Sequence, residues 1–239
     1  MIAPDFAQVL RRGPTMAERV SGSPALRRWQ LLTRLLCHGL ARVRIEGRVN
    51  VPDRGPLIVA VNHTSAMDGA LLFGLLGRTV SFLVKTEAFE PWHGLAGRVL
   101  IRGAQLPVRR YHVDPAPVRL SLRLLEQGGV LGICPEGSRG DGRVSHARPG
   151  VGYFALKSGA PVLPVAVHGA QAMVPGVGWR RPPVLIVFGE PIRTAAAGNP
   201  LNRRRWLAAT EQIRLELAAL VRDTAPGTAE NTRESGLND

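Results

Sequence analysis

The residues best suited to chemistry stand at the end of one apolar run. Leu57 to Val61 are all apolar, which is typical of a strand buried on both faces, and the polar residues Asn62, His63 and Asp68 follow. A histidine takes a proton near neutral pH without special tuning, and a nearby aspartate fixes its tautomer and stabilises the charged ring. The stretch therefore predicts a strand that ends in a His–Asp pair suited to acid–base catalysis.

The spacing of this pair restricts how the two side chains can meet. His63 and Asp68 are five residues apart, and on one regular helix they would point about 140° apart. They can meet only if His63 lies in the turn after the strand and Asp68 folds back from the start of a helix. The alternative interpretation is that His63 is an ordinary loop histidine and Asp68 an N-cap, a position that aspartate favours.

Further polar residues end other predicted strands. Arg109 follows a short strand, Lys85 ends another, and the loop Glu136–Arg139 follows a strand over 130–134. Strands alternate with helical segments, which predicts an α/β fold with a mainly parallel sheet covered by helices on both faces. Ligands bind at the carboxyl ends of such strands, so we expect these polar segments to gather at that edge.

The composition favours one globular domain. The chain has 239 residues, of which 45% are hydrophobic, and this is enough for one sizeable core. We expect a loosely ordered N-terminus over 1–23, a single domain over 24–222 and a disordered polar tail over 223–239. Two cysteines give no disulfide framework and suit a reducing compartment.

The charge and the first predicted helix favour a membrane surface. The net charge is +13, which suits anionic lipid, phosphorylated substrates or nucleic acid. The helix over 24–42 has Trp29 and several leucines on one side and arginines on the other; it either lies in a membrane interface or packs on its own domain. No segment reaches the roughly 18 apolar residues of a transmembrane helix, and no secretory signal is evident. We therefore expect a peripheral protein at the cytoplasmic face of the membrane.

Four motifs in this order resemble those of the glycerolipid acyltransferase family, whose best-known members are the 1-acyl-glycerol-3-phosphate acyltransferases. The segment Asn62–Asp68 matches the Asn-His-x-x-x-x-Asp motif, and Gly103–Arg109 is similar to the second motif. Cys134–Arg139 matches the Pro-Glu-Gly-Thr/Ser-Arg motif with a cysteine where an aromatic residue is common, and Leu163–Val167 matches the last motif. Lys85 looks like the lysine that opens the segment before the second motif.

The resemblance implies transfer of a fatty acyl group from an acyl thioester, either acyl-CoA or acyl carrier protein, to the free hydroxyl of a lysophospholipid. The default acceptor is 1-acyl-glycerol-3-phosphate. His63 would be the general base, with Asp68 orienting it, and neither a metal nor a cofactor is required. The other residues would bind the acceptor: Arg109 and Arg139 its phosphate, Glu136 and Gly137 its glycerol part, and Ser138, Lys85 and Asn62 beside them. The oxyanion donors are expected among the backbone amides of these loops.

Three alternatives stay open. The acceptor could be another lyso-lipid, such as a lyso-ornithine lipid or a glycolipid intermediate. The protein could be a serine hydrolase or thioesterase that uses Ser65 or Ser138, although the Gly-x-Ser-x-Gly elbow is missing. It could also be a basic module without enzymatic activity that binds lipid or nucleic acid. That interpretation explains the charge but not the polar loops at Asn62–Asp68, Arg109 and Glu136–Arg139. We expect no nucleic-acid partner.

Overall fold

The chain divides into two compact units that are each built from separate stretches. The computed structural model describes residues 13–89, 99–109, 115–173, 181–194 and 202–226. Unit 1 consists of 1–37, 52–58 and 69–133, and unit 2 of 38–51, 59–68 and 134–239. The sequence predicted one domain over 24–222. That single domain stays a prediction.

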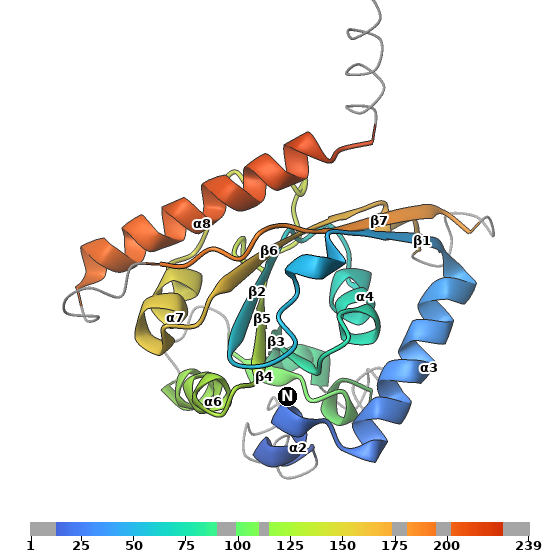
Figure 1. Cartoon of the computed structure of the whole chain (residues 1–239), viewed down its shortest axis with the longest axis horizontal. Coiled ribbons are helices and arrows are strands. Elements are labelled where there is room, and N and C mark those ends of the chain that lie inside the picture. The colour runs from blue at the N-terminus through green and yellow to red at the C-terminus, as the bar shows by residue number, and fades with distance from the viewer. Residues whose placement is uncertain (1–12, 90–98, 110–114, 174–180, 195–201, 227–239) are drawn as a thin grey trace, which may run out of the picture. The chain divides into compact units, whose positions relative to one another are not determined.

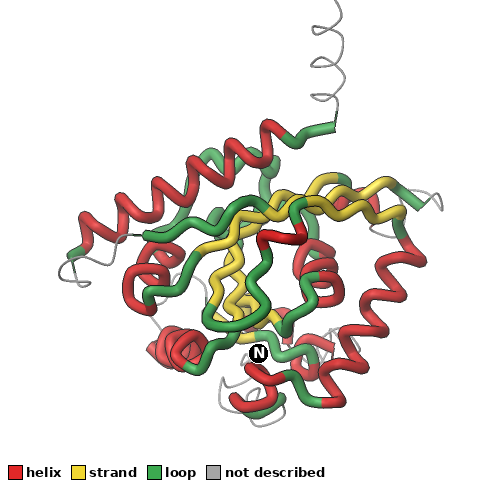
Figure 2. Tube along the Cα trace, viewed as in Figure 1, coloured by secondary structure: helices red, strands yellow, loops and turns green. Residues whose placement is uncertain are grey.

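The described strands form a seven-stranded sheet in the order β1-β7-β6-β2-β5-β3-β4 (Figures 1 and 2). β3 pairs in parallel with both β4 and β5, β1 pairs in parallel with β7, and β6 pairs antiparallel with β7. The predicted α/β fold with a mainly parallel sheet is therefore confirmed. The strands are β1 (Arg42–Glu46), β2 (Leu57–Val61), β3 (Val80–Lys85), β4 (Leu106–Val108), β5 (Val130–Ile133), β6 (Val162–His168) and β7 (Pro183–Phe188).

The core of unit 1 forms around β3 and its two parallel neighbours. Every residue of β5 is buried, as expected for a continuous apolar run covered on both faces. The side chain of Gln105, just before β4, accepts a hydrogen bond from the Phe82 amide at 2.8 Å and donates to the Val80 carbonyl at 3.3 Å. The helices of this unit include α6 (Pro115–Glu126) and most of α4 (Met67–Leu75), and a short 3-10 turn (Thr86–Phe89) follows β3.

The N-terminus is more ordered than its composition suggested. We expected residues 1–23 to be loosely held, but Met16–Ser21 form helix α2, which opens with a capping box between Thr15 and Glu18. The buried Arg19 donates hydrogen bonds to the carbonyls of Pro14 and Ala104, and burial lowers the pKa of Arg19 to about 10. A buried arginine that is bonded to two carbonyls fixes this segment, and hydropathy patterning does not show such a contact. Residues 1–12 lie outside the described part of the chain.

Helix α3 (Pro24–Leu40) ends two residues before the predicted 24–42, because β1 begins at Arg42, and its faces also differ from the prediction. Leu26 and Cys37 are buried, whereas Leu31, Leu32, Leu35 and Leu36 are 55–61% exposed. The sequence predicted leucines on one side of this helix and arginines on the other, yet these four leucines are exposed together. They stand among the exposed arginines 27, 28 and 34.

Unit 2 places two helices beside its strands. Helix α7 (Gly150–Ser158) packs against α8 (Arg203–Asp223), and α8 also contacts β6 (Figure 1). A side chain at Gly152 would collide with Thr210 and the Trp206 carbonyl, so this glycine permits the close crossing of α7 and α8. The predicted tail over 223–239 begins inside the last turn of α8, and its residues 227–239 lie outside the described ranges. The short 3-10 turns here are Arg48–Asn50 and Ala170–Met173.

In the described part of the chain, every helix falls short of the length and apolar character that crossing a membrane would require.

Candidate active site

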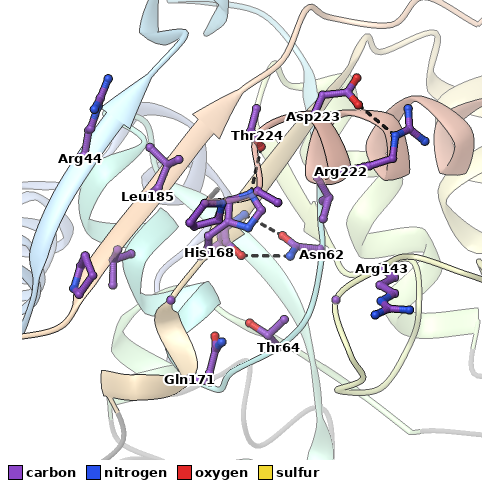
Figure 3. A pocket seen from close by; sticks show the side chains of 18 of the residues that line it. Arg44, Asn62, Thr64, Arg143, His168, Gln171, Leu185, Arg222, Asp223 and Thr224 are labelled. Carbon is purple, nitrogen blue, oxygen red and sulfur yellow. Dashed lines mark hydrogen bonds and ion pairs between the residues drawn. The ribbon is translucent and has the colours of Figure 1, made fainter. Parts of the chain in front are cut away.

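The end of β2 is joined to β6 through one side chain. All five residues of β2 are buried, and the next residue, Asn62, is 1% exposed. Its amide donates to the Val167 carbonyl at 3.0 Å, and its carbonyl oxygen accepts from the Val167 amide at 2.8 Å (Figure 3). Within unit 2, Asn62 thus holds the start of the polar loop against β6. Both polar atoms of its amide are occupied within the protein, so its expected contact with substrate stays a prediction.

His63 and Asp68 meet as the spacing required. Asp68 is the second residue of α4, and its Oδ2 lies 3.0 Å from His63 Nδ1. The same oxygen accepts from the amides of Thr64 at 2.9 Å and Ser65 at 2.8 Å. The Asp68 side chain is fully buried and that of His63 is 21% exposed. The predicted fold-back of Asp68 from the helix start is confirmed. The His63 imidazole is therefore held by a buried carboxylate while part of the ring stays exposed.

The alternative that Asp68 is an N-cap describes only part of its contacts. Asp68 lies inside α4, and it is Ser65 Oγ that accepts from the Met67 amide at the first helical residue. Asp68 does take up two backbone N–H groups of the loop, as a cap would. The additional contact with His63 Nδ1 is what an N-cap interpretation leaves unexplained.

This arrangement selects one tautomer of the histidine. A carboxylate oxygen is only an acceptor, and Asp68 Oδ2 already accepts from two amides, so the facing His63 Nδ1 carries the proton. His63 Nε2 is then left with a lone pair. An imidazole held in this way can accept a proton at Nε2 while Asp68 stabilises the positive charge.

The loop after β5 holds the main chain of His63 from two directions. Glu136 Oε1 accepts from the His63 amide at 3.0 Å, and the Gly140 amide donates to the His63 carbonyl at 2.9 Å. Glu136 is 2% exposed. Burial raises the pKa of Glu136, and the His63 N–H and the charges of His146 and His63 act in the opposite direction.

The rest of this loop differs in exposure along its length. Gly137 has a φ of 72°, which favours glycine, and a Cβ there would collide with the side chain of Arg148. Ser138 is half-buried and Arg139 is exposed. Gly137 therefore admits the side chain of Arg148 close to the backbone, and the substrate contacts expected of Gly137, Ser138 and Arg139 stay predictions.

Two of the predicted cations lie at the carboxyl ends of neighbouring strands in unit 1. Lys85 is the last residue of β3 and is paired in register with Val108, the residue before Arg109. Both Lys85 and Arg109 are exposed. The carboxyl ends of two neighbouring parallel strands thus carry a lysine and an arginine, and their contact with a phosphate stays a prediction.

Many backbone amides of the polar loops already donate within the protein. The amides of His63, Thr64 and Ser65 donate to Glu136 or Asp68, and those of Gly137 and Gly140 donate to the carbonyls of Cys134 and His63. The expected oxyanion donors must therefore come from other groups. The amides still to be considered as oxyanion donors are therefore fewer than the sequence suggested.

A cavity of about 1250 Å³ in unit 2 is bordered by both neighbours of His63 (Figure 3). Near its centre, His168 Nε2 lies 2.9 Å from the Thr224 hydroxyl, and burial lowers the pKa of His168. Both apolar and charged side chains line the cavity. Its lining includes Asn62, Thr64, Val167, Leu185, Val221, Arg44, Arg143 and Arg222.

The sequence did not reveal three residues that shape the site. Arg148 fills the space at Gly137, Ser65 caps α4, and Gly140 binds the carbonyl of His63. A serine just before a predicted helix is a recognisable capping signal. Arg148 carries no such signal, because its contact depends on how the loop returns to α7.

Comparisons with known proteins agree with the fold and the motifs. A family model described as "Acyltransferase" matches residues 42–168, more than half of the chain. The chain is similar to the 1-acyl-sn-glycerol-3-phosphate acyltransferase of Bacillus subtilis, with 26% identity over 183 residues that cover 74% of this chain and 87% of that protein. It is also 30% identical over 141 residues to the chloroplastic 1-acyl-sn-glycerol-3-phosphate acyltransferase LPAT1 of Arabidopsis thaliana, covering 56% of this chain and 38% of that protein.

A solved structure shares the fold. The crystal structure of the 1-acyl-sn-glycerophosphate acyltransferase PlsC from Thermotoga maritima matches with a TM-score of 0.55 and 24% identity. The match covers 81% of this chain and 80% of that one. At this identity the likeness concerns the arrangement of strands and helices.

Proposed function

Because the chain belongs to the acyltransferase family, we propose that it is an O-acyltransferase whose acceptor is a lysophospholipid, in the first place 1-acyl-glycerol-3-phosphate. The product would be phosphatidic acid, and the reaction would belong to phospholipid biosynthesis. Relatives named for this activity support the choice of acceptor. Among the features of the structure, the contact between His63 Nδ1 and Asp68 Oδ2 carries the proposal.

The proposed reaction needs one base and no covalent enzyme intermediate. His63 Nε2 takes the proton from the acceptor's hydroxyl as its oxygen attacks the thioester carbonyl. The tetrahedral adduct expels the thiolate, and His63 passes the proton to this thiolate. The products are an ester and a thiol. General base catalysis of this kind is worth roughly 10²–10⁴ in rate, and Asp68 stabilises the imidazolium while the proton is held.

The acceptor's phosphate suits cationic side chains. Lys85 at the end of β3 and Arg109 just after β4 are our candidates for binding it, with Arg139 on the exposed part of the loop after β5. A guanidinium fork matches phosphate oxygens in a bidentate manner. The donor is an acyl thioester on CoA or on acyl carrier protein, and both carry negative charge that suits a chain with a net charge of +13.

The decisive experiment is a panel of radiolabelled lyso-acceptors, each offered with acyl-CoA and with acyl carrier protein, and read by lipid chromatography. We expect the largest kcat/KM with 1-acyl-glycerol-3-phosphate. A preference for lyso-ornithine lipid or a glycolipid intermediate would replace the acceptor but keep the chemistry. No transfer with any acceptor would overturn the proposal.

The serine hydrolase alternative is weakened by the position of Ser65. This serine is 2% exposed, and its hydroxyl accepts from the Met67 amide, so it is poorly placed to attack a substrate. Ser138 is half-buried. Labelling with a serine-reactive fluorophosphonate tests both, since an acyltransferase that uses His63 as base should take up no label.

We further propose that α3 attaches the protein to the membrane surface. Four leucines that are 55–61% exposed, next to exposed arginines, form an amphipathic surface suited to an anionic interface. Leu32→Asn and Leu36→Asn should each weaken sedimentation with phosphatidylglycerol vesicles by roughly five- to tenfold. Leu215→Asn, an exposed leucine on α8, is the matched control and should bind as the wild type does. Equal losses in all three variants would argue against α3 as the membrane contact.

A further inference from the structure

One carboxylate of the site faces the main chain of the histidine rather than open space. Glu136 was expected to accept a hydrogen bond from the acceptor's glycerol hydroxyl. Its Oε1 is instead occupied by the His63 amide at 3.0 Å, and the residue is 2% exposed. A group this buried, with one oxygen already in use, is poorly placed to receive a substrate hydroxyl.

Both main-chain polar groups of His63 are bound by the loop after β5. Glu136 takes its amide, and four residues later Gly140 donates to its carbonyl at 2.9 Å. A Cβ at Gly140 would lie 3.1 Å from Glu136 Oε2, so the two residues that bind the main chain of His63 lie close to each other. The loop is in turn fixed by the Gly137 amide on the Cys134 carbonyl and the Arg148 amide on the Pro135 carbonyl.

These bonds decide where the catalytic nitrogen lies. Asp68 binds the imidazole at Nδ1, but the position of the ring also depends on the position of the main chain to which it is attached. With both the backbone and Nδ1 held, the position of Nε2 is determined. A displacement of about 1 Å at a reacting group can cost on the order of 10² in rate.

We propose that Glu136 is a positioning residue, which fixes the main chain of His63 through its amide and so sets the position of Nε2, rather than a group that binds the acceptor. The inference rests on the proposed function, because it gives Glu136 a role in the same transfer. It assigns Glu136 of the Pro-Glu-Gly segment 135–137 to the support of the base instead of the recognition of glycerol.

Two substitutions separate the two roles. In Glu136→Gln the side-chain oxygen can still accept from the His63 amide, whereas Glu136→Met fills a similar volume without an acceptor. Glu126→Gln, at an exposed glutamate on α6, removes a carboxylate charge elsewhere and is the control. For each protein, kcat and the two KM values are measured. Amide exchange is followed by NMR in protein labelled with [15N]histidine; the chain has six histidines, and His63→Ala identifies the signal of His63.

A positioning role predicts a split between the variants. Glu136→Gln should keep kcat within about threefold of the wild type, and Glu136→Met should lower it by about 10²-fold with the acceptor KM changed by less than about threefold. The His63 amide should exchange faster in Glu136→Met than in the wild type and Glu136→Gln.

The opposite pattern would overturn the proposal. If Glu136→Met raised the acceptor KM by about tenfold or more while kcat stayed near that of the wild type, Glu136 would be a binding residue. Equal losses in Glu136→Gln and Glu136→Met, or unchanged exchange of the His63 amide in Glu136→Met, would also count against it. If the wild type transferred no acyl group to any acceptor, the proposed function would fail, but the exchange rates would still decide whether Glu136 holds His63.

Discussion

The His63–Asp68 segment and the Lys85–Arg109 pair are built in opposite ways. In unit 2, Asp68 is fully buried, and the amide, the carbonyl and the imidazole of His63 each have a partner within the protein. In unit 1, Lys85 and Arg109 stand exposed at the ends of two strands. One region is fixed by its own hydrogen bonds, and the other presents charge to solvent.

The difference follows from what each region is proposed to do. Proton transfer depends on distances of a few tenths of an ångström, so the base must be held before the substrate arrives. A phosphate carries its charge on several oxygens, and long cationic side chains can close on it after it binds. Substitutions in the two regions should therefore affect different kinetic constants.

The largest effect is expected at the base. His63→Ala removes the only group proposed to take the hydroxyl proton and should lower kcat by roughly 10²–10⁴. Because the imidazole is also a partner of the buried Asp68 carboxylate, the free energy of unfolding should fall by about 1–3 kcal/mol, so kcat is compared on protein shown to be folded. His146→Ala, at an exposed histidine, is the control and should keep full activity. A folded His63→Ala protein with wild-type kcat would remove the basis of the mechanism.

Asp68→Asn should damage both rate and stability. Asp68 Oδ2 accepts three hydrogen bonds, whereas Oδ1 is buried and, among the described residues, has no hydrogen-bond partner. The Asn side chain can take two orientations. Its NH₂ group either faces the three donors that Oδ2 bound or points into the buried space of Oδ1 without an acceptor, and either one should lower the free energy of unfolding by about 1–3 kcal/mol. The tautomer of His63 is also lost, so kcat should fall by about 10²–10³. Urea unfolding and kcat together test this, and a normal rate with reduced stability would leave Asp68 as a structural residue only.

At the exposed pair the effect should appear in binding. Arg109→Ala removes a charged hydrogen-bond donor worth about 1.5–3 kcal/mol, which corresponds to an acceptor KM raised by about 10- to 100-fold. Lys85→Ala should raise it less, because an ammonium group makes no bidentate contact. The KM of the donor and kcat should change little, and Arg119→Ala, at an exposed arginine on α6, should behave as the wild type. Equal increases in both KM values would argue against a phosphate contact.

The same contrast explains what the sequence could predict. The strand over 57–61, the fold-back of Asp68 and the placement of Lys85 and Arg109 at strand ends depend on local patterns, and they were correct. An apolar run, a five-residue spacing and a turn signal are properties of a few neighbouring residues.

The contacts that the sequence missed join distant residues. Glu136 and His63 are 73 residues apart, and no pattern indicates that a carboxylate will face an amide rather than a substrate. The burial of Arg19 and the exposed leucines of α3 likewise depend on which surfaces pack together. Side-chain type predicted the chemistry of each group, but tertiary packing decides its partner.

The smallest effect is a dependence of stability on pH at Glu136. Burial raises the pKa of this carboxyl from its ordinary value of 4.5, so between 4.5 and the raised value the folded state binds more protons than the unfolded state. Stability is therefore lost as the pH rises through this window, and it is fully present below it. Glu136→Gln cannot ionise, so its unfolding midpoint in urea should rise relative to that of the wild type on going from about pH 4.5 to neutral pH. Glu126→Gln, whose carboxylate was exposed, should show no such trend. A difference between Glu136→Gln and the wild type that stayed constant with pH would mean that Glu136 ionises in the folded protein as it does in water. The contrast between the buried carboxylates that hold His63 and the exposed cations of unit 1 would then depend on Asp68 alone.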